Sequence, residues 1–436
     1  MNNQWTTATL EDIASISLSG VDKHIVPGEA SVRLCNYLDV YRNRRLTNSY
    51  KFSSGTVTPS ELESFRLRKG DVLITKDSET PDDIGVPAVI VDDITDTVCG
   101  YHLALIRPTK SVNPIFLSYQ FQSEAAKRHF LRTATGVTRF GLSVRAIASF
   151  PVPIPPPEEQ AAIARILDVV DIAIDQTRET VERGRETKAA IIQQFFFRAL
   201  GETAYADRPT KKLPAGWALV PTETLLNSEP KNGVSPKASS QPPGLPTFSI
   251  AAIRHGNVNL GNKEHLKYAQ LPEKVAKAYQ VNRGDVLIVR GNANPDLVGK
   301  AGMIDHFPDG CIYPDITKRV VFRQKGDHTV TPPFAVLVWN HSIVHNQVLR
   351  RAKTSNGTLK INNRDVKQIV VPVPTPQEQA VLVNVTEALD RKIDALSDVA
   401  NAYEQLKRSL LHDLLTGKVR VNHLNIDSMV KISMVR

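Results

Sequence analysis

The residues best suited to binding chemistry in this chain are basic and amide side chains that follow a repeated pentapeptide. Lys76 and Arg290 each stand two residues after a copy of Gly-Asp-Val-Leu-Ile, where a strand is expected to open into a loop. A cation at that place can reach a phosphate or a guanine edge, and the alternative is a solvated charge at a strand end. Asn292 and Asn294 follow the second copy. They are of the type that hydrogen-bonds adenine, or else they form turns.

Other cations are grouped at two further places. Arg44 and Arg45 belong to the densest basic cluster of the first half, whose third member, Arg42, alone has a counterpart, Arg254. We therefore expect Arg44 and Arg45 to distinguish the first half from the second. The second cluster contains Arg350, Arg351, Lys353 and Lys360, with Arg139 as the nearest match in the first half. Phosphate anchoring is the favoured role for such residues, and cations placed near a helix carboxyl end are the alternative.

Catalytic patterns are not supported by this sequence. Thr331-Pro-Pro-Phe334 is similar to the Asn/Asp-Pro-Pro-Tyr/Phe motif of amino-methyltransferases, but a threonine cannot bind the target amine as Asn or Asp does. The first half has Asn113-Pro-Ile-Phe116 at the same place, so the pattern predicts a helix start. Asp71 and Asp285 stand in the repeated Gly-Asp turn, where we expect capping of backbone amides. There is no phosphate loop, zinc-protease motif or nucleophile elbow. The sequence predicts a non-catalytic chain without a metal or cofactor site.

Composition and charge narrow the class of protein. The net charge of +9 over 436 residues favours an anionic partner such as nucleic acid. Cys35, Cys99 and Cys311 are too far apart for a zinc motif and odd in number, so no disulfide framework is expected. With neither a signal-peptide pattern nor a long apolar run, we expect a cytoplasmic protein with no membrane partner.

The elements that must position these residues occur twice. Val-Pro-Ile-Pro-Pro-Pro-Glu-Glu-Gln-Ala (152–161) returns as Val-Pro-Val-Pro-Thr-Pro-Gln-Glu-Gln-Ala (371–380), a shift of 219. Each copy leads into about 40 residues whose apolar positions alternate steps of four and three, as in a coiled coil. The first seam is Ile163, Leu167, Val170, Ile174, Thr177, Val181, Gly184, Lys188, Ile191 and Phe195, and adding 219 gives the second. A helix that long with one apolar stripe needs a partner, and its own copy is the nearest candidate.

The repeat extends through the globular parts, with a shift that grows from 212 at Trp5 and Trp217 to 219 at the helices. Residues 111–135 and 329–354 are expected to be helical, and Thr375, Pro376 and Glu378 predict a capped helix start. Five segments follow from these patterns: a domain over 1–150, a hinge, helix and linker over 151–211, a domain over 212–370, a hinge and helix over 371–421, and a frayed tail over 422–436. The predicted fold class is α+β, with two mixed α/β domains joined by two long helices that pair antiparallel.

The repeated Pro-x-Pro-x-x-Glu-Glu-Gln hinges, the two Gly-Asp-Val-Leu-Ile strands and the final Leu-Leu-Thr-Gly-Lys-Val-Arg-Val resemble the specificity subunit of type I restriction-modification systems. The resemblance covers essentially the whole chain. It implies two target-recognition domains that read a bipartite, asymmetric sequence in double-stranded DNA, with the helices as a spacer.

The resemblance also implies partners. Two methyltransferase subunits would bring S-adenosylmethionine, and motor-nuclease subunits would bring ATP and Mg²⁺. Two alternatives stay open from the sequence. One is the same module in a methylation-only or other phage-defence complex, and the other is a coiled-coil scaffold that does not bind DNA.

Overall fold

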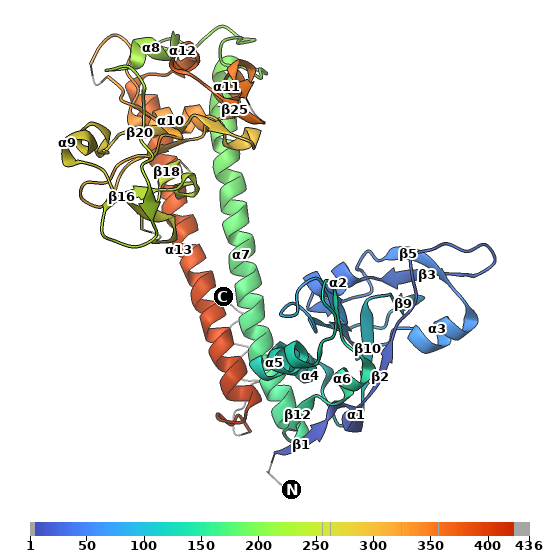
Figure 1. Ribbon diagram of the computed structural model, residues 1–436. Coiled ribbons are helices and arrows are strands. Elements are labelled where there is room, and N and C mark those ends of the chain that lie inside the picture. Colours follow the sequence, from blue (N-terminus) through green and yellow to red (C-terminus); the bar gives the residue numbers. More distant parts are fainter. Residues whose placement is uncertain (1–4, 255, 262, 324, 356, 423–436) are drawn as a thin grey trace. The chain divides into compact units, whose positions relative to one another are not determined.

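The computed structural model describes residues 5–254, 256–261, 263–323, 325–355 and 357–422 (Figure 1). The predicted frayed tail falls almost wholly on 423–436, outside the described residues. The chain forms two compact units, Met1–Glu179 with Leu396–Arg436, and Thr180–Ala395. Each unit contains one globular domain and one half of each long helix, so the units do not follow the five predicted segments, whose boundaries stay a prediction.

The first unit is built on a five-stranded sheet. Its strand order is β2 (Ala14–Leu18), β10 (Leu103–Pro108), β6 (Val72–Thr75), β8 (Pro87–Ile90) and β4 (Arg45–Leu46). All neighbours are antiparallel except β4 and β8. Every residue of β6 and β8 is buried, which explains why Val-Leu-Ile is a continuous apolar run and does not alternate.

Smaller sheets and short helices complete the first domain. The sheets are β5 (Ser53–Val57), β3 (Ala30–Cys35) and β9 (Thr97–Cys99); β7 (Asp77–Ser78) with β11 (Phe140–Gly141); and β1 (Thr6–Thr9) with β12 (Pro151–Ile154). The helices are α1 (Leu10–Ile13), α2 (Tyr37–Arg42), α3 (Pro59–Phe65), α4 (Pro114–Gln122), α5 (Glu124–Thr133) and α6 (Val144–Ala148).

The second unit has a six-stranded sheet. Its order is β14 (Lys231–Asn232), β23 (Thr317–Val320), β20 (Val286–Val289), β22 (Ala301–Met303), β18 (Asn257–Val258) and β17 (Ile253–Arg254). The smaller sheets are β15 (Ala238–Ser239), β19 (Leu266–Ala269) and β16 (Leu245–Phe248); β21 (Gly291–Asn292), β25 (Thr358–Lys360) and β24 (Lys353–Ser355); and β13 (Ala218–Pro221) with β26 (Val370–Val373). The α-helices are α8 (Thr222–Leu225), α9 (Glu273–Ala276), α10 (Pro332–Asn340), α11 (Ser342–Arg351) and α12 (Asn363–Lys367), with 3₁₀ turns at Ile250–Ala252, Lys263–His265, Lys277–Tyr279 and Pro295–Leu297.

Strand register shows that the two domains repeat one core. The order β10-β6-β8-β4 recurs as β23-β20-β22-β18. Arg45 pairs with Val89 in the first domain, and Asn257 pairs with Met303 in the second, in both cases through a parallel bridge. Asn257 therefore occupies the place of Arg45, and Gly256 that of Arg44.

The single helices expected over 111–135 and 329–354 were wrong in one respect, because each is two helices. Ser123 separates α4 from α5, and His341 separates α10 from α11. Both residues have extended backbone, and the side chain of each accepts a hydrogen bond from the first turn of the next helix. The expected helix starts are confirmed, since Asn113 caps α4 and Thr331 caps α10.

The long helices are α7 (Pro157–Leu200, 44 residues) and α13 (Pro376–Leu415, 40 residues). In the first unit the beginning of α7 packs against the end of α13, through Ile163 and Leu167 with Leu414. In the second unit the end of α7 packs against the beginning of α13, so the pairing is antiparallel, as predicted. A Cβ atom built on Gly184 would lie 3.0 Å from Ile393 Cγ1, so this glycine permits a close helix approach.

The repeated glutamine of each hinge explains part of the Pro-rich motif. Gln160 is buried, accepts a hydrogen bond from the Asn113 amide at 2.8 Å and donates to the carbonyls of Ser111 and Pro155. Gln379 makes the same contacts with the Thr331 amide and with the carbonyls of Thr329 and Pro374. Each glutamine therefore joins the start of a long helix to the helix pair of its own domain.

Candidate nucleic-acid interface

One surface is built in the same way in both domains, at the end of the central strand. In the first, β6 leads through Lys76 into β7, and Lys76 O accepts a hydrogen bond from Leu142 N at 2.8 Å. In the second, β20 leads through Arg290 into β21, and Arg290 O accepts from Ile361 N at 2.9 Å. We call these two places the strand-end surfaces. Each consists of the basic residue, the short strand after it and the segment paired with that strand.

In the first strand-end surface, Lys76 is held by neighbours. Its ammonium lies 3.2 Å from the Asp77 carboxylate and 4.7 Å from the centre of the Tyr101 ring, and its side chain is 12% exposed. His102 Nδ1 lies 2.7 Å from the same carboxylate, on a turn where His102 has φ +72°. The sequence analysis missed Tyr101 and His102. The signal available in the sequence was their place immediately before Leu103, where β10, the strand next to β6, begins.

Two predicted residues of the first domain are exposed near this end of the sheet. Arg42 ends α2, whose Tyr41 hydroxyl donates to Asp83 in the loop after β7 at 2.9 Å. Arg139 is exposed in the segment that precedes β11, and it has no ion-pair partner among the described residues. Arg42 and Arg139 are therefore both exposed.

In the second strand-end surface, the two asparagines act as turn residues. Asn292 Oδ1 accepts from Asn294 N at 2.8 Å, and Asn294 Oδ1 accepts from Asp296 N at 2.9 Å. Arg290 is also partly engaged, with Nε 2.5 Å from the Asp315 carbonyl. The acceptor oxygens of both asparagines therefore shape the loop, which was the alternative left open from the sequence.

Lys353 and Lys360 are the most exposed cations of this surface. They stand directly opposite one another in the antiparallel pair of β24 and β25. Opposite residues on adjacent strands point to the same face, and like charges there are unfavourable. Neither lysine has a carboxylate partner within the described part of the chain. The pair therefore forms a concentrated positive site that an anion would stabilise.

Lys318 is a buried residue of β23 that was not singled out by its sequence. Its ammonium donates 2.7 Å hydrogen bonds to the side chains of Asn232 and Asn363. Burial and, to a lesser extent, the charge of Arg290 lower the pKa of Lys318 to about 8. It is a buried positioning residue that joins β14, β23 and α12.

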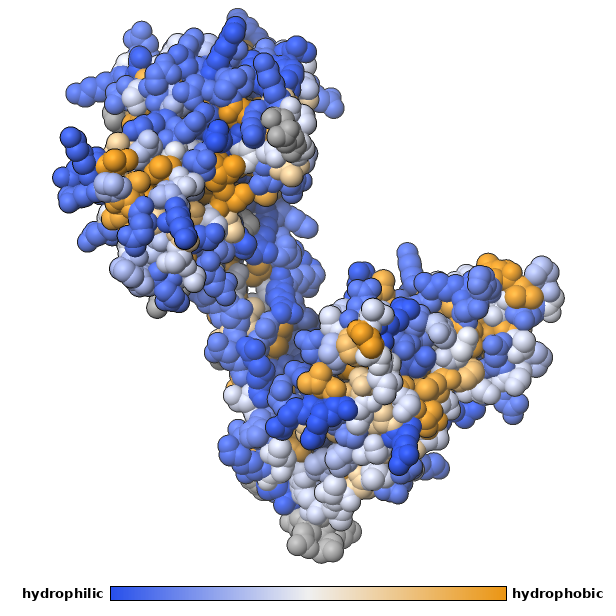
Figure 2. Space-filling model, in the orientation of Figure 1, coloured by the Kyte–Doolittle hydropathy of each residue, from blue (hydrophilic) through white to orange (hydrophobic). Residues whose placement is uncertain are grey.

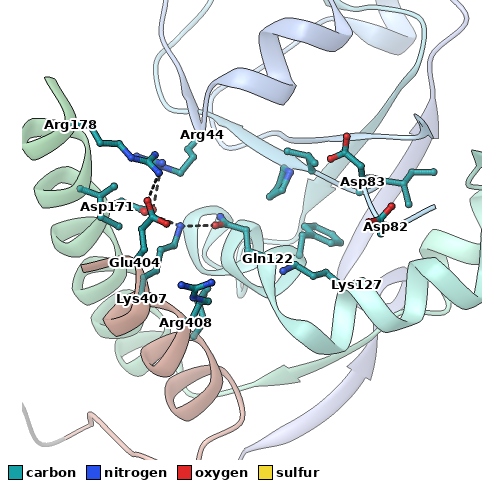
Figure 3. Close-up of a pocket in the computed structure, with 17 residues that line it drawn as sticks. Arg44, Asp82, Asp83, Gln122, Lys127, Asp171, Arg178, Glu404, Lys407 and Arg408 are labelled. Carbon is teal, nitrogen blue, oxygen red and sulfur yellow. Dashed lines mark hydrogen bonds and ion pairs between the residues drawn. The ribbon is translucent and has the colours of Figure 1, made fainter. Parts of the chain in front are cut away.

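Arg44 and Arg45 contact acidic side chains of α7, and Figure 3 shows Arg44 close to Asp171. Arg44 pairs with Asp175 and, at 3.2 Å, with Asp171 of α7, while Arg45 lies 2.5 Å from Asp168. These acids are spaced three and four residues apart, so they lie on one helix face. The two arginines neutralise this acidic stripe and thereby anchor the domain to α7.

Tyr119 completes the anchor. Its hydroxyl donates to Asp168 at 2.7 Å and to Asp171 at 2.8 Å. Burial and then the two carboxylates raise the pKa of Tyr119, so it stays a donor.

Some of the remaining basic residues contact carboxylates or carbonyl oxygens, and others are exposed. Arg350 is engaged with Asp207 at 2.6 Å, and Arg351 donates to the Gln347 and Gln368 carbonyls. Arg254 is exposed, and its Nε donates to the Ala251 carbonyl at 3.0 Å. The structure therefore gathers Lys353 and Lys360 beside Arg290, and separates Arg350 and Arg351 from them.

The expected structural role of the repeated Gly-Asp turn is confirmed. Asp71 accepts from Arg68 N and Asp285 from Asn282 N, both at 2.8 Å. Asp71 also binds the Arg107 guanidinium through two hydrogen bonds of 2.8 and 2.9 Å. These contacts use the carboxylates to close the turn.

The visible face of each unit is mostly hydrophilic, with apolar residues in small patches (Figure 2). Within the described residues, no helix has the length and apolar character needed to cross a bilayer.

Residues 2–183 match a family model described as the type I restriction modification DNA specificity domain. The EcoKI specificity subunit of Escherichia coli K12 is 23% identical over 397 residues, covering 88% of this chain and 83% of that protein. The StySPI specificity subunit of Salmonella potsdam is 21% identical over 392 residues, 88% of this chain and 82% of that protein.

A solved structure shares the fold. The crystal structure of a type I restriction-modification S subunit from M. genitalium aligns with a TM-score of 0.56 at 14% identity, over 95% of this chain and 96% of the other. The family model, the curated relatives and the two-domain, two-helix architecture agree. Residues 2–183 therefore match the type I restriction modification DNA specificity domain, and most of the chain is similar to type I specificity subunits.

Proposed function

We propose that this chain selects the DNA sequence for a type I restriction-modification complex by placing one strand-end surface on each half of a bipartite target. The observation that carries the proposal is the repeated construction of these surfaces, in which Lys76 and Arg290 follow equivalent strands and their carbonyls accept equivalent hydrogen bonds. Two surfaces of one design can approach a duplex in the same manner.

The target would be asymmetric because the two surfaces carry different side chains. Asp77 and Ser78 in the first domain correspond to Gly291 and Asn292 in the second. Only the second has the opposed lysines, Lys353 and Lys360. Side chains at the groove determine which base edges are read, so different surfaces favour different half-sites.

The repeated features of the helix pair support docking of two copies of one partner, the methyltransferase subunit. The Lys188–Asp390 ion pair recurs as Lys407–Asp171 after the shift of 219. A groove between domain and helices also recurs, about 500 Å³ in the first unit and about 900 Å³ in the second. Gln122, Asp171 and Ile174 line the first, and their counterparts Asn340, Asp390 and Ile393 line the second.

S-adenosylmethionine would be held by the methyltransferase subunits, and ATP with Mg²⁺ by motor-nuclease subunits. The unbroken helices would set the gap between half-sites. Adding one heptad to each helix at corresponding positions adds roughly 10 Å at about 1.5 Å per residue. The methylated target should then acquire a longer spacer with unchanged half-sites.

The decisive experiment is long-read methylation profiling of cells that express this chain with its cognate methyltransferase subunit. One bipartite asymmetric motif should be methylated. Replacing residues 1–150 by the corresponding domain of a relative should change one half of that motif only. A palindromic motif, or a change in both halves, would refute the proposal, as would methylation by this chain alone.

A further inference from the structure

An open apolar groove lies on the helix pair of the second unit. It encloses about 830 Å³ between Ile191 and Phe195 of α7 and Val381 and Val385 of α13, with Trp217 at its edge. We call it the Trp217 groove. Val381 is 63% exposed and Val385 is 41% exposed, although both are aliphatic. Two neighbouring aliphatic side chains on one helix face, next to a tryptophan, indicate a surface that a partner covers.

The corresponding place in the first unit is already occupied. Trp5 and Glu159 stand there as Trp217 and Glu378 stand in the second unit, and in both cases the indole donates to the glutamate, at 3.0 and 3.1 Å. The chain after α13 crosses this place with the sequence Lys418-Val-Arg-Val421. Val421 is 3% exposed and packs with Ile163 and Leu167.

Arg420 is the basic residue of that covering segment. Its guanidinium makes two 2.8 Å hydrogen bonds to Glu159 and lies 5.7 Å from the centre of the Trp5 ring. The Val421 amide donates to the same carboxylate at 3.1 Å, and Glu159 is 1% exposed. In the first unit, therefore, a basic residue binds the glutamate of the helix start and lies near the tryptophan, and the aliphatic residue after it covers the apolar side chains.

The second unit does not supply such a cover from the equivalent segment. Gly201 stands where Arg420 stands after the shift of 219, and it has no side chain to offer. The linker runs instead toward α11, where Ala206 N donates to the Ile343 carbonyl at 3.0 Å. Glu378 stays half-buried, and its Oε1 accepts only from Trp217 within the described residues.

We infer that the Trp217 groove receives a segment of the methyltransferase subunit in which an arginine or lysine is flanked by aliphatic residues. The basic group would bind Glu378 and stack on Trp217, and the aliphatic side chains would cover Val381 and Val385. The partner would then complete in the second unit what residues 418–421 complete in the first. The inference rests on the proposed function for the identity of the partner.

Site-specific cross-linking in the assembled complex tests this placement. A photo-cross-linking residue at position 381 should capture a methyltransferase peptide that contains an arginine or lysine beside aliphatic residues. The same residue at Val399, an aliphatic position that is 42% exposed on the α13 segment of the first unit, is the matched control and should not capture that peptide. Cross-links to residues 423–436, to a second copy of this chain, or to a peptide without a basic residue would overturn the inference.

Binding measurements give an independent test. Val381→Glu should weaken binding of the methyltransferase copy on the second unit at least about tenfold, as expected at an apolar contact centre, while Val399→Glu should not. Glu378→Gln should also weaken binding of the methyltransferase subunit, because glutamine lacks the negative charge that would attract the basic group. Glutamine can still serve in the capping box, so the helix start should be kept. Wild-type affinity in both groove variants would overturn the inference.

DNA binding by the free chain separates the two hypotheses. Val381→Glu should retain sequence-specific DNA binding, because the groove lies on the helices. If the unmodified chain shows no sequence preference, the proposed function fails. If the preference is intact and the groove variants still bind the methyltransferase normally, only the present inference fails.

Discussion

Lys188 of α7 places its ammonium 2.6 Å from the Asp390 carboxylate of α13, inside a mainly apolar seam. The same pair recurs in the first unit, where Lys407 lies 2.8 Å from Asp171. All four positions are related by the shift of 219. A charged pair within an apolar seam fixes the register of two helices, because any slip leaves both charges buried without partners.

The register role predicts strong coupling between these two residues. Lys188→Met and Asp390→Asn should each lower the free energy of unfolding, and the double variant should recover part of the loss. We expect a coupling energy of about 1–3 kcal/mol in a double-mutant cycle measured by chemical denaturation. The exposed Arg391–Glu387 pair of α13, at 4.0 Å, is the control and should couple by less than about 0.5 kcal/mol.

The opposed lysines predict an effect on DNA binding without a loss of stability. Lys360→Ala should weaken DNA binding and reduce the slope of log affinity against log salt by about 0.9, the value for one lost phosphate contact. Thermal stability should stay equal or rise, since repulsion with Lys353 is removed. An unchanged salt slope would show that Lys360 does not contact phosphate.

The anchor residues predict the opposite pattern. Arg45→Ala leaves Asp168 with a partly buried charge and should lower stability, by about 1–3 kcal/mol for a charged hydrogen bond. The salt slope of DNA binding should stay unchanged if Asp168 engages Arg45 in the complex as it does in the free chain. A reduced slope with unaltered stability would contradict the anchoring role.

Lys318 predicts a pH dependence in the second unit. Its pKa is about 8 in the folded protein, below the ordinary 10.5, so between these values the unfolded chain binds more protons than the folded one. Stability contributed by this site should therefore rise with pH across that window, by up to roughly 3 kcal/mol at about 1.4 kcal/mol per factor of ten. The free energy of unfolding should be measured at several pH values for the unmodified protein and for Lys318→Met. The rise between pH values of about 8 and 10.5 should be smaller in the variant, because the variant lacks the titrating group.

The hydrogen bonds that Glu159 accepts predict how residues 418–421 respond to acid. Burial raises the pKa of Glu159, but hydrogen bonds from Arg420, Trp5 and the Val421 amide outweigh burial, so the pKa lies below its ordinary 4.5. Its stabilising effect is complete above that value and is lost as the pH falls through the folded pKa. The protection factor of the Val421 amide, which is its hydrogen exchange relative to the intrinsic rate at the same pH, should fall in acid. Glu159→Gln should remove the protection at neutral pH, while Glu378→Gln in the second unit should not.

The sequence by itself determined the repeat, the two long helices and their seams, because helical periodicity and capping depend on residues close together in the chain. Thr375 and Glu378 cap α13 as their spacing predicted, with the Glu378 amide 3.3 Å from Thr375 Oγ1. The equivalence of Lys76 and Arg290 was also visible as a constant shift. The breaks at Ser123 and His341 were not visible, since either residue is tolerated within a helix and only packing selects the extended backbone.

Only the tertiary structure decided which basic residues are free. Arg45 and Asp168 are 123 positions apart, and no local pattern in the sequence indicates that they meet. Lys353 and Lys360 looked like members of one cluster with Arg350, yet strand pairing separates the two lysines from an arginine that Asp207 neutralises. The physical reason is that the availability of a charge depends on the nearest opposite charge in space, and folding determines that neighbour.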